Sequence, residues 1–592
     1  MCVRIFQTYE EERMKKTAAF IAVLAVLGCT TGALLAQSGE DAKFKKFQDS
    51  FWDAYFKFYP TAGTLQGYTK YNDKLEDPSE GALDKFNEIL DGFNQELVTK
   101  IDRSKLSAEN QIDHEMYLDF LDLEFLKLQY TLPWQDNPLL YNDLFVQSLR
   151  SVLVKNGGNA ASAAARAKLI PGLVKRAKDS LKNPPQEYTQ AAIDQMPAIL
   201  DFYRVEVPKL SGGAAALQAE VGKAITALED YQRWLKGDLL AKSTGNFRMP
   251  DPHLRLLRRT TQGNLPILED VVKRSLADFN NIRRDMFLVC IPFYKIMYPH
   301  IDIEQLGRTK GEEQTRNIVI QGVLDKIKGD HVGRDEFVGR ISSGAAAIRT
   351  FVQQQNLIEL PADTLTVEPL PAYGQPGLWS ILSHPGAFEA AGTYTLYVKP
   401  VPAEWSAEDA ASFMEEHNNY YMDFMSIQNI FPGQFVPLAM TRKDPSTIRR
   451  IAANQGLLKG WPIFLEDLFM ESGYGNYDLR MRLNQLKLLL KTVIDFQMDI
   501  NVHEGTWTKD KVIDYMTVRG FMTKAEAERR WNKIVLNPGD GAQPYIGYQE
   551  ILDMEKDYRK LKGDSFNAKE FLQKLVSHGA IPLVKLKAKI AQ

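Results

Sequence analysis

Apolar residues recur at intervals of three and four along most of the chain, which is the pattern of helices with one buried face. The pattern is clearest over residues 47–60 (FQDSFWDAYFKFYP), 114–129 (HEMYLDFLDLEFLKLQ) and 173–181 (LVKRAKDSL). Glycine and proline clusters separate such stretches, and residues 156–173 contain a Gly-Gly break, then an alanine-rich helix, then a proline. We therefore predict a large, mainly α-helical fold.

One region departs from the helical pattern. Between about residues 360 and 402, the segments DTLTVEPLPAY and GTYTLYVKPVP are rich in β-branched and aromatic residues and are bounded by Pro and Gly. They predict a small β element of two or three short strands. Helices resume at residue 406, where Ser406 is a plausible N-cap with Glu408 and Asp409 in the first turn.

The N-terminus has the layout of an export signal. From Met14 the chain reads MKKTAAFIAVLAVLGCTTGALLAQ, a short basic start followed by an apolar stretch and small residues. We interpret residues 1–36 as an upstream extension plus a signal, with the true start at Met14 and cleavage after Ala36. Two alternatives stay open: acylation of Cys29 within a lipobox (VLGC), and an uncleaved anchor. All three place the protein outside the cytoplasm, in the periplasm or cell envelope.

The remaining chain divides into an N-terminal helical region, 40–355, and a C-terminal region, 356–592, although 40–592 is also consistent with one continuous domain. Hydrophobic content is 44%, charged content is 25% and the formal charge is -3, as in ordinary soluble globular proteins. This charge favours neither nucleic acid nor an acidic membrane surface as a partner. A membrane is expected only through the signal or a lipid on Cys29.

Generic motifs for catalysis are missing from the sequence. Of the three cysteines only Cys290 follows the signal, so the mature chain has neither an intramolecular disulfide nor a cysteine metal cluster, and we expect a buried thiol. No two of the eight histidines lie four residues apart, which excludes an HExxH zinc helix. Nucleophile elbows, phosphate-binding loops and calcium loops are also missing.

The segment SIQNIFPGQF, residues 426–435, gathers three carboxamides around a helix break: Gln428, Asn429 and Gln434. Pro432 cannot donate a backbone hydrogen bond, and its ring would press on the carbonyl of Gln428. The Pro-Gly break could therefore bring Gln428 and Gln434 together.

This segment resembles the His-Glu-Ala-x-Pro-Gly-His-His stretch of the bacterial family named domain of unknown function 885, whose members look like metallopeptidases. In ungapped register, Gln428 and Gln434 stand on the first two histidines, Phe435 on the third and Asn429 on the glutamate. The resemblance covers about residues 45–590. Further stretches, 457–475, 498–507 and 537–552, keep these family residues: Gly460, Trp461, Glu466, Glu471, Gly473, Tyr474, Asp499, His503, Trp507, Pro538, Gly539, Ile546 and Gly547.

The resemblance also shows departures at the positions that carry chemistry. Lys459 stands on a glutamate and Asp540 on a glutamine. Zinc in hydrolases takes histidine and carboxylate ligands, whereas an amide oxygen is a weak ligand and a lysine ammonium repels a metal. An amide at position 429 cannot act as a general base. We therefore predict that zinc and catalysis are lost and, as a hypothesis, that amide oxygens of Gln428, Asn429 or Gln434 hold the Lys459 ammonium.

These observations predict a pseudoenzyme that keeps a cleft for a peptide or small-molecule ligand. Strand 392–400 (GTYTLYVKP) is the candidate for pairing with a peptide backbone. Five residues are candidates for lining the cleft: His503, Asp499, Glu466, Trp461 and Tyr545. Trp461 and Glu466 could instead be packing residues, and His503 could be a structural histidine. The alternative is an active hydrolase that uses His503 with Asp499, Glu466 or Tyr545.

Overall fold

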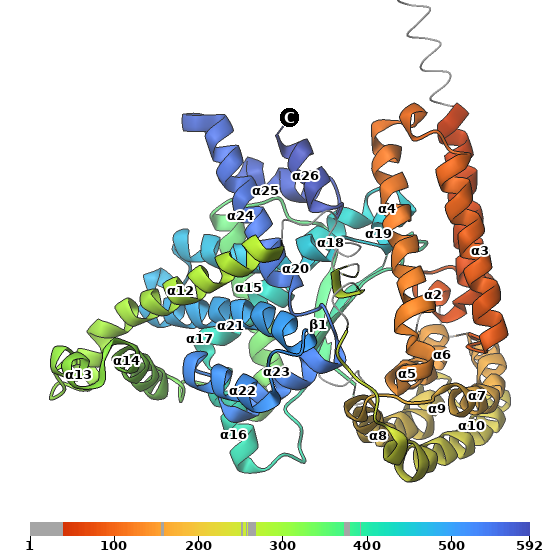
Figure 1. Cartoon of the computed structure of the whole chain (residues 1–592), viewed down its shortest axis with the longest axis horizontal. Coiled ribbons are helices and arrows are strands. Elements are labelled where there is room, and N and C mark those ends of the chain that lie inside the picture. The colour runs from red at the N-terminus through yellow and green to blue at the C-terminus, as the bar shows by residue number, and fades with distance from the viewer. Residues whose placement is uncertain are drawn as a thin grey trace, which may run out of the picture.

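The computed structural model describes residues 39–154, 159–249, 253–255, 257, 268–371, 379–390 and 392–591. The predicted signal, Cys2 and Cys29 lie outside these ranges. The fold is mainly α-helical with one small sheet, as the sequence predicts (Figure 1). Among the described helices, none is long and apolar enough to cross a membrane.

The described part of the N-terminal half is helical. Its helices are a first helix over 39–58, α2 (Pro60–Leu65), α3 (Glu80–Thr99), α4 (Ala108–Phe125), α5 (Pro133–Asp136), α6 (Pro138–Val154), α7 (Ala160–Ser180), α8 (Gln186–Asp201), α9 (Val207–Leu210), α10 (Ala215–Trp234), α12 (Leu268–Met297), α13 (Ile303–Lys310), α14 (Glu312–Ile327) and α15 (Phe337–Gln354). The proline expected to end the alanine-rich helix, Pro171, instead lies inside α7. A proline removes one backbone donor, and the packed neighbours of α7 can offset that loss.

Three strands follow: β1 (Leu365–Pro369), β2 (Ser380–Ser383) and β3 (Tyr394–Val398). Their order is β1-β3-β2, with β1 parallel and β2 antiparallel to β3. The predicted strand 392–400 is therefore the central one, and both its edges are already paired. It cannot accept a peptide backbone, so that part of the prediction is wrong. Strands β1 and β2 form the edges.

The C-terminal half is again helical. Its helices are α16 (Ala407–Glu416), α17 (Asn419–Asn429), α18 (Phe435–Arg442), α19 (Thr447–Ile451), α20 (Gln455–Glu471), α21 (Leu479–His503), α22 (Lys509–Asp514), α23 (Lys524–Leu536), α24 (Gln543–Lys562), α25 (Ala568–Ser577) and α26 (Leu583–Ile590). The predicted cap is confirmed, because the Ser406 hydroxyl accepts a hydrogen bond from the Asp409 backbone N–H at 3.0 Å.

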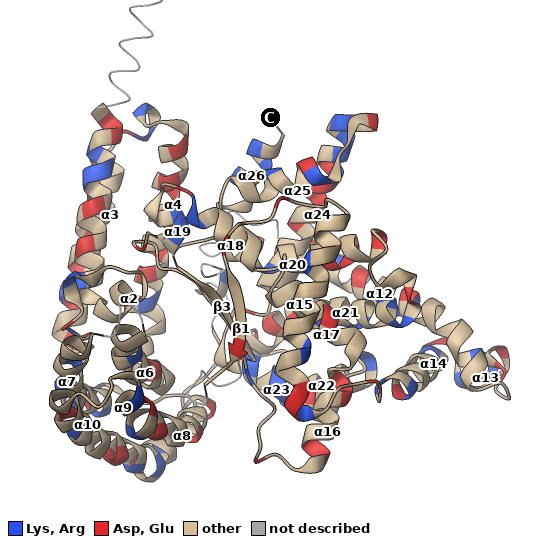
Figure 2. Ribbon diagram, turned by 180° about the vertical axis from the view of Figure 1, so that it is seen from behind, with Lys and Arg blue, Asp and Glu red and all other residues tan. Residues whose placement is uncertain are grey.

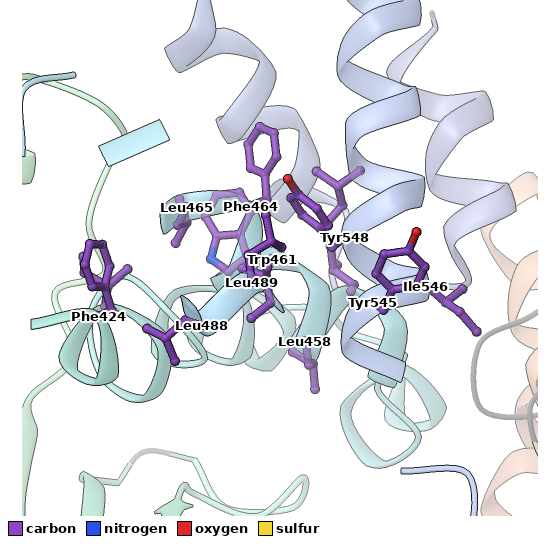
Figure 3. Close-up of a cluster of buried hydrophobic side chains, with 14 of the residues drawn as sticks. Phe424, Leu458, Trp461, Phe464, Leu465, Leu488, Leu489, Tyr545, Ile546 and Tyr548 are labelled. Carbon is purple, nitrogen blue, oxygen red and sulfur yellow. The ribbon is translucent and has the colours of Figure 1, made fainter. Parts of the chain in front are cut away.

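Buried apolar side chains form two cores. One lies within α5–α10, and the other joins residues 44–121 to residues 271–590, on both sides of position 355. Figure 3 shows the centre of the larger core, where Trp461 of α20 packs among aromatic and aliphatic side chains of the neighbouring helices. Cys290 is buried in this core, and burial raises the pKa of its thiol to about 12. The predicted buried thiol is confirmed.

The backbones of helices α20 and α24 are in direct contact because glycines line the interface between the two helices. A Cβ built on Gly460 would lie 2.2 Å from the Gly547 carbonyl carbon, and one built on Gly547 would lie 1.9 Å from the Gly456 oxygen. No side chain fits in such a gap. The two glycines therefore hold the helix that carries Lys459 and Glu466 against the segment that carries Asp540.

Candidate functional site

The Pro-Gly break separates α17 from α18 rather than kinking one helix. The last carbonyls of α17 stay paired across the break, since Gly433 N–H donates to the Ile427 oxygen at 3.0 Å and Gln434 N–H to the Gln428 oxygen at 3.1 Å. A Cβ on Gly433 would lie 2.1 Å from the Gln428 oxygen, so only glycine fits there. The break thus joins the backbones of Gln428 and Gln434 by a hydrogen bond, whereas the predicted gathering of their side-chain amides stays a prediction.

The side chain of Gln428 points to α20. Its amide Nε2 donates a hydrogen bond to Oε1 of Glu466, a carboxyl group that is wholly buried. Burial raises the pKa of Glu466 well above its ordinary value, and the hydrogen bond from Gln428 opposes this only in part. Burial therefore favours the neutral form of the Glu466 carboxyl group, and one of its oxygens accepts a hydrogen bond from a neutral amide.

Asn429 faces the sheet and its own helix. Its Nδ2 donates to the Met425 carbonyl at 2.9 Å, while its Oδ1 accepts from the Ser380 hydroxyl of β2 at 3.3 Å. Position 429, which the resemblance assigns to a general base, is thus occupied by an amide that ties α17 to the edge strand β2.

Lys459 pairs with Asp540, on the turn before α24. Its side chain is 24% exposed, and Lys533 Nζ lies 3.8 Å from the other oxygen of Asp540. Although burial favours the neutral acid, the charge of Lys459 holds the pKa of Asp540 below its ordinary value. The hypothesis that amide oxygens of Gln428, Asn429 or Gln434 hold the Lys459 ammonium is wrong. A carboxylate compensates an ammonium better than neutral amides do.

Asp499 and His503 lie one turn apart on α21, wholly buried. Asp499 accepts the backbone N–H groups of Gly539 at 2.9 Å and Ala542 at 3.2 Å, which shapes the turn that presents Asp540. His503 Nε2 lies 3.1 Å from the Ile534 carbonyl oxygen and 3.7 Å from Asp499 Oδ1. These contacts are those of structural residues that position a turn.

The other two candidates also face inward. Trp461 is fully buried, and its indole N–H meets no hydrogen-bond partner among the described residues. The Tyr545 hydroxyl donates to Asp278 of α12 at 2.7 Å. Glu466, His503 and Tyr545 therefore have separate partners: Gln428, Ile534 and Asp278. The contacts do not assemble them into one catalytic group.

The side chains at the positions that the resemblance assigns to metal ligands do not fit zinc. Two amides and an ammonium stand at the ligand positions that the resemblance assigns, and the described part of the chain contains no group of three His, Cys, Asp or Glu side chains able to hold a metal ion. Amide oxygens bring no charge to offset the dehydration of a divalent ion, and the nearby lysine repels it.

Two parts of the site escaped the sequence reasoning. The role of Ser380 in β2 had no local signal. The ion pair between Lys459 and Asp540 did have a signal in the sequence, because the resemblance places a glutamate at position 459 and a glutamine at position 540. Two departures that together create opposite charges are a signal of contact, even across 81 positions.

Comparison with known proteins agrees with the fold. A family model described as "Bacterial protein of unknown function (DUF885)" matches residues 60–590. A structure from Shewanella oneidensis has 22% sequence identity and a TM-score of 0.77, over 93% of this chain and 100% of its own. One from Colwellia psychrerythraea has 14% identity and a TM-score of 0.71, over 93% and 98%. Both are described as putative lipoproteins, and no curated protein matches the sequence.

Proposed function

The chain belongs to the bacterial protein family of unknown function DUF885, and we propose that it is an exported, catalytically inactive member of this family. We further propose that it binds peptides in an extended conformation. The leader-like sequence 14–36 and the description of both structural neighbours as putative lipoproteins support a place in the cell envelope.

One observation carries the proposed inactivity. The side chains at the positions of the metal-site motif are neutral or cationic, and several are bound to groups of the protein itself: Gln428 to Glu466, Asn429 to Ser380, and Lys459 to Asp540. A zinc hydrolase site instead needs imidazole or carboxylate ligands and a base that can accept a proton from water. The carboxyl group that Gln428 contacts, that of Glu466, is wholly buried, and its raised pKa favours the neutral form, which does not act as a base.

The edge of β2 supports peptide binding. In an antiparallel pair, alternate residues direct their backbone groups toward the partner strand. The backbone N–H of Lys399 donates to the Trp379 carbonyl oxygen at 2.8 Å. By the alternation along β2, the backbone N–H and C=O groups of Ile381 and Ser383 also face β3. Ser380 and Leu382 thus turn their N–H and C=O groups away from β3, to an edge that pairs with no other strand among the described residues, and the Ser380 hydroxyl contacts Asn429. An extended peptide can pair with such an edge without any metal.

The decisive experiment compares the zinc content of two proteins after incubation with excess zinc and removal of unbound ion. One is the wild type. The other carries Gln428→His, Asn429→Glu, Gln434→His and Lys459→Glu, together with Asp540→Gln so that no carboxylate faces the new glutamate. We expect less than about a tenth of an equivalent in the wild type and about one in the variant. Asp540→Gln alone is the matched control and should stay metal-free.

Either of two results would contradict the proposal. Near-stoichiometric zinc in the wild type would mean that the donor set has been misjudged. A variant that folds but takes up no zinc would mean that these positions never formed the metal site.

A further inference from the structure

Both ends of the described chain and the tips of two helical hairpins lie at one edge of the molecule (Figure 1). The start of the first helix is fastened to the α3–α4 turn, because the backbone N–H of Asp102 donates to Glu40 at 2.9 Å and that of Ser107 to Asp41 at 3.0 Å. The ends of α24 and α26 reach the same height in Figure 1. We call this the terminal edge, formed by residues 98–107, 559–567 and 585–591.

Two tips of the terminal edge repeat one combination of side chains. Val98, at the end of α3, is 61% exposed, and Leu561, at the end of α24, is 60% exposed. Each stands within two residues of an exposed lysine, Lys100 and Lys560, and neither lysine forms an ion pair with another described residue. Single exposed aliphatic residues are common. Two of them at the same edge, each beside a free ammonium, form a pattern.

The terminal edge is also basic in sequence. Its three segments contain nine Lys and Arg against two Asp and Glu, in a chain with a formal charge of -3. Figure 2 shows the blue positions at the end of α24 and along α26. Seven of these nine cations pair with carboxylates, most of which lie just outside the three segments: Arg103 and Lys585 with Glu115, Lys105 with Asp102, Arg559 with Glu555, Lys562 with Glu570, Lys587 with Asp557 and Lys589 with Glu109. The attraction to an anionic surface therefore falls mainly on Lys100 and Lys560.

The chain that precedes the structure leaves from this edge. Nine residues separate Cys29 from Gly39, and they can span at most about 30 Å when fully extended. A lipid on Cys29, or a retained signal, would therefore hold the terminal edge within about 30 Å of the bilayer. At that range even weak contacts are populated, because tethering raises the effective concentration of the surface.

From this placement we infer that the terminal edge docks on an anionic bilayer surface, with Val98 and Leu561 entering the interface and Lys100 and Lys560 contacting lipid phosphates. An aliphatic side chain flanked by lysines suits this interface, where the chain meets acyl groups and the ammonium meets headgroups. The contact fixes the orientation of a tethered protein rather than anchoring it alone.

A tethered reporter tests this docking. The chain from Gln37 onward, with an N-terminal histidine tag, is bound to vesicles that carry a nickel-chelating lipid in either phosphatidylcholine or a phosphatidylcholine–phosphatidylglycerol mixture. An environment-sensitive dye is placed on Leu561→Cys, since the native Cys290 is buried. The matched control places the dye on Ile296→Cys of α12, which is 77% exposed and outside the terminal edge.

We expect the dye at position 561, but not at 296, to report an apolar environment on the anionic vesicles, and high salt to reverse it. Adding Lys100→Glu and Lys560→Glu should lower the docked fraction by about five-fold per lysine or more. Equal signals from both dyes, no signal at 561 on anionic vesicles, or insensitivity to the two charge reversals would overturn the inference.

Discussion

Glu466 explains why a neutral amide suits position 428. The carboxyl group is wholly buried, and burial raises its pKa well above the ordinary value, which favours its uncharged form. An uncharged acid needs no counter-ion, and Glu466 Oε1 accepts the amide N–H of Gln428. The other oxygen, Oε2, meets no hydrogen-bond partner among the described residues.

The raised pKa of Glu466 makes a testable prediction with a defined sign. The unfolded carboxyl ionises above about pH 4.3, whereas the folded one stays protonated, so its contribution to stability falls as the pH rises. Glu466→Gln keeps the acceptor for Gln428 and removes the titration. We expect the stability of this variant relative to wild type to rise by up to about 1.4 kcal/mol per pH unit above pH 4.3.

Urea unfolding at pH 5, 6, 7 and 8 measures this difference. If the two proteins show the same change of unfolding free energy with pH, Glu466 is ionised in the folded protein and the neutral pair with Gln428 does not exist.

At the scale of elements, the two edges of the sheet offer a matched comparison. Alternate residues of a strand direct their backbone groups toward the neighbouring strand and away from it. Leu382 of β2 and Val367 of β1 are both residues whose backbone N–H points away from β3. Proline at either position removes an outward donor without removing a bond to β3, which is where sheets tolerate proline. Only β2 lies beside Asn429.

We therefore expect Leu382→Pro to abolish binding of extended peptides and Val367→Pro to leave it within about two-fold of wild type. Fluorescence anisotropy against a mixture of labelled peptides detects the binding, and the circular dichroism of both variants should match the wild type. Equal loss in both variants, or retained binding in Leu382→Pro, would exclude the edge of β2 as the peptide site.

At the scale of the whole molecule, a buried charge cluster joins α16, α21 and α23. Glu416 accepts hydrogen bonds from Lys487 and Lys491, and Glu526 pairs with Arg530 at 2.8 Å. Although burial favours its neutral form, the two lysines hold the pKa of Glu416 far below its ordinary value. Such a cluster is strongly destabilised when one partner is removed or neutralised.

His417 lies at this cluster, stacked on Phe413, with Glu416, Glu526 and Lys491 acting on its ring. Burial lowers the pKa of His417 to about 4. The unfolded histidine is protonated below about pH 6.5. The stability that comes from keeping the folded ring neutral is therefore present above pH 6.5 and lost as the pH falls toward 4. The loss amounts to about 3 kcal/mol.

We expect His417→Gln to lose less stability than wild type between pH 6.5 and pH 4.5, as measured by urea unfolding. The pH dependence from His417 is opposite in sign to that from Glu466. A Glu466→Gln variant that keeps His417 should therefore lose unfolding free energy more steeply than the wild type as the pH falls from 6.5 to 4.5. An unchanged pH dependence in His417→Gln would mean that the histidine is already charged in the folded protein.

The sequence by itself determined the helical class, the place of the β element, the Ser406 cap, the buried Cys290 and the backbone break that joins Gln428 to Gln434. Each of these follows from local patterns: hydrophobic periodicity, capping residues, and the missing N–H of Pro432. The identities of Gln428, Asn429, Gln434 and Lys459 can be read without the fold, and that they mark a lost metal site stays a prediction.

Only the tertiary structure decided which partner each side chain meets. Lys459 meets Asp540 of the turn before α24, β3 lies between β1 and β2 in the sheet, and His503 contacts the Ile534 carbonyl. These pairings join residues far apart in the chain, and the free energy that selects them comes from the packing of whole elements. A hydropathy pattern reports which face of an element is buried, but not what lies against it.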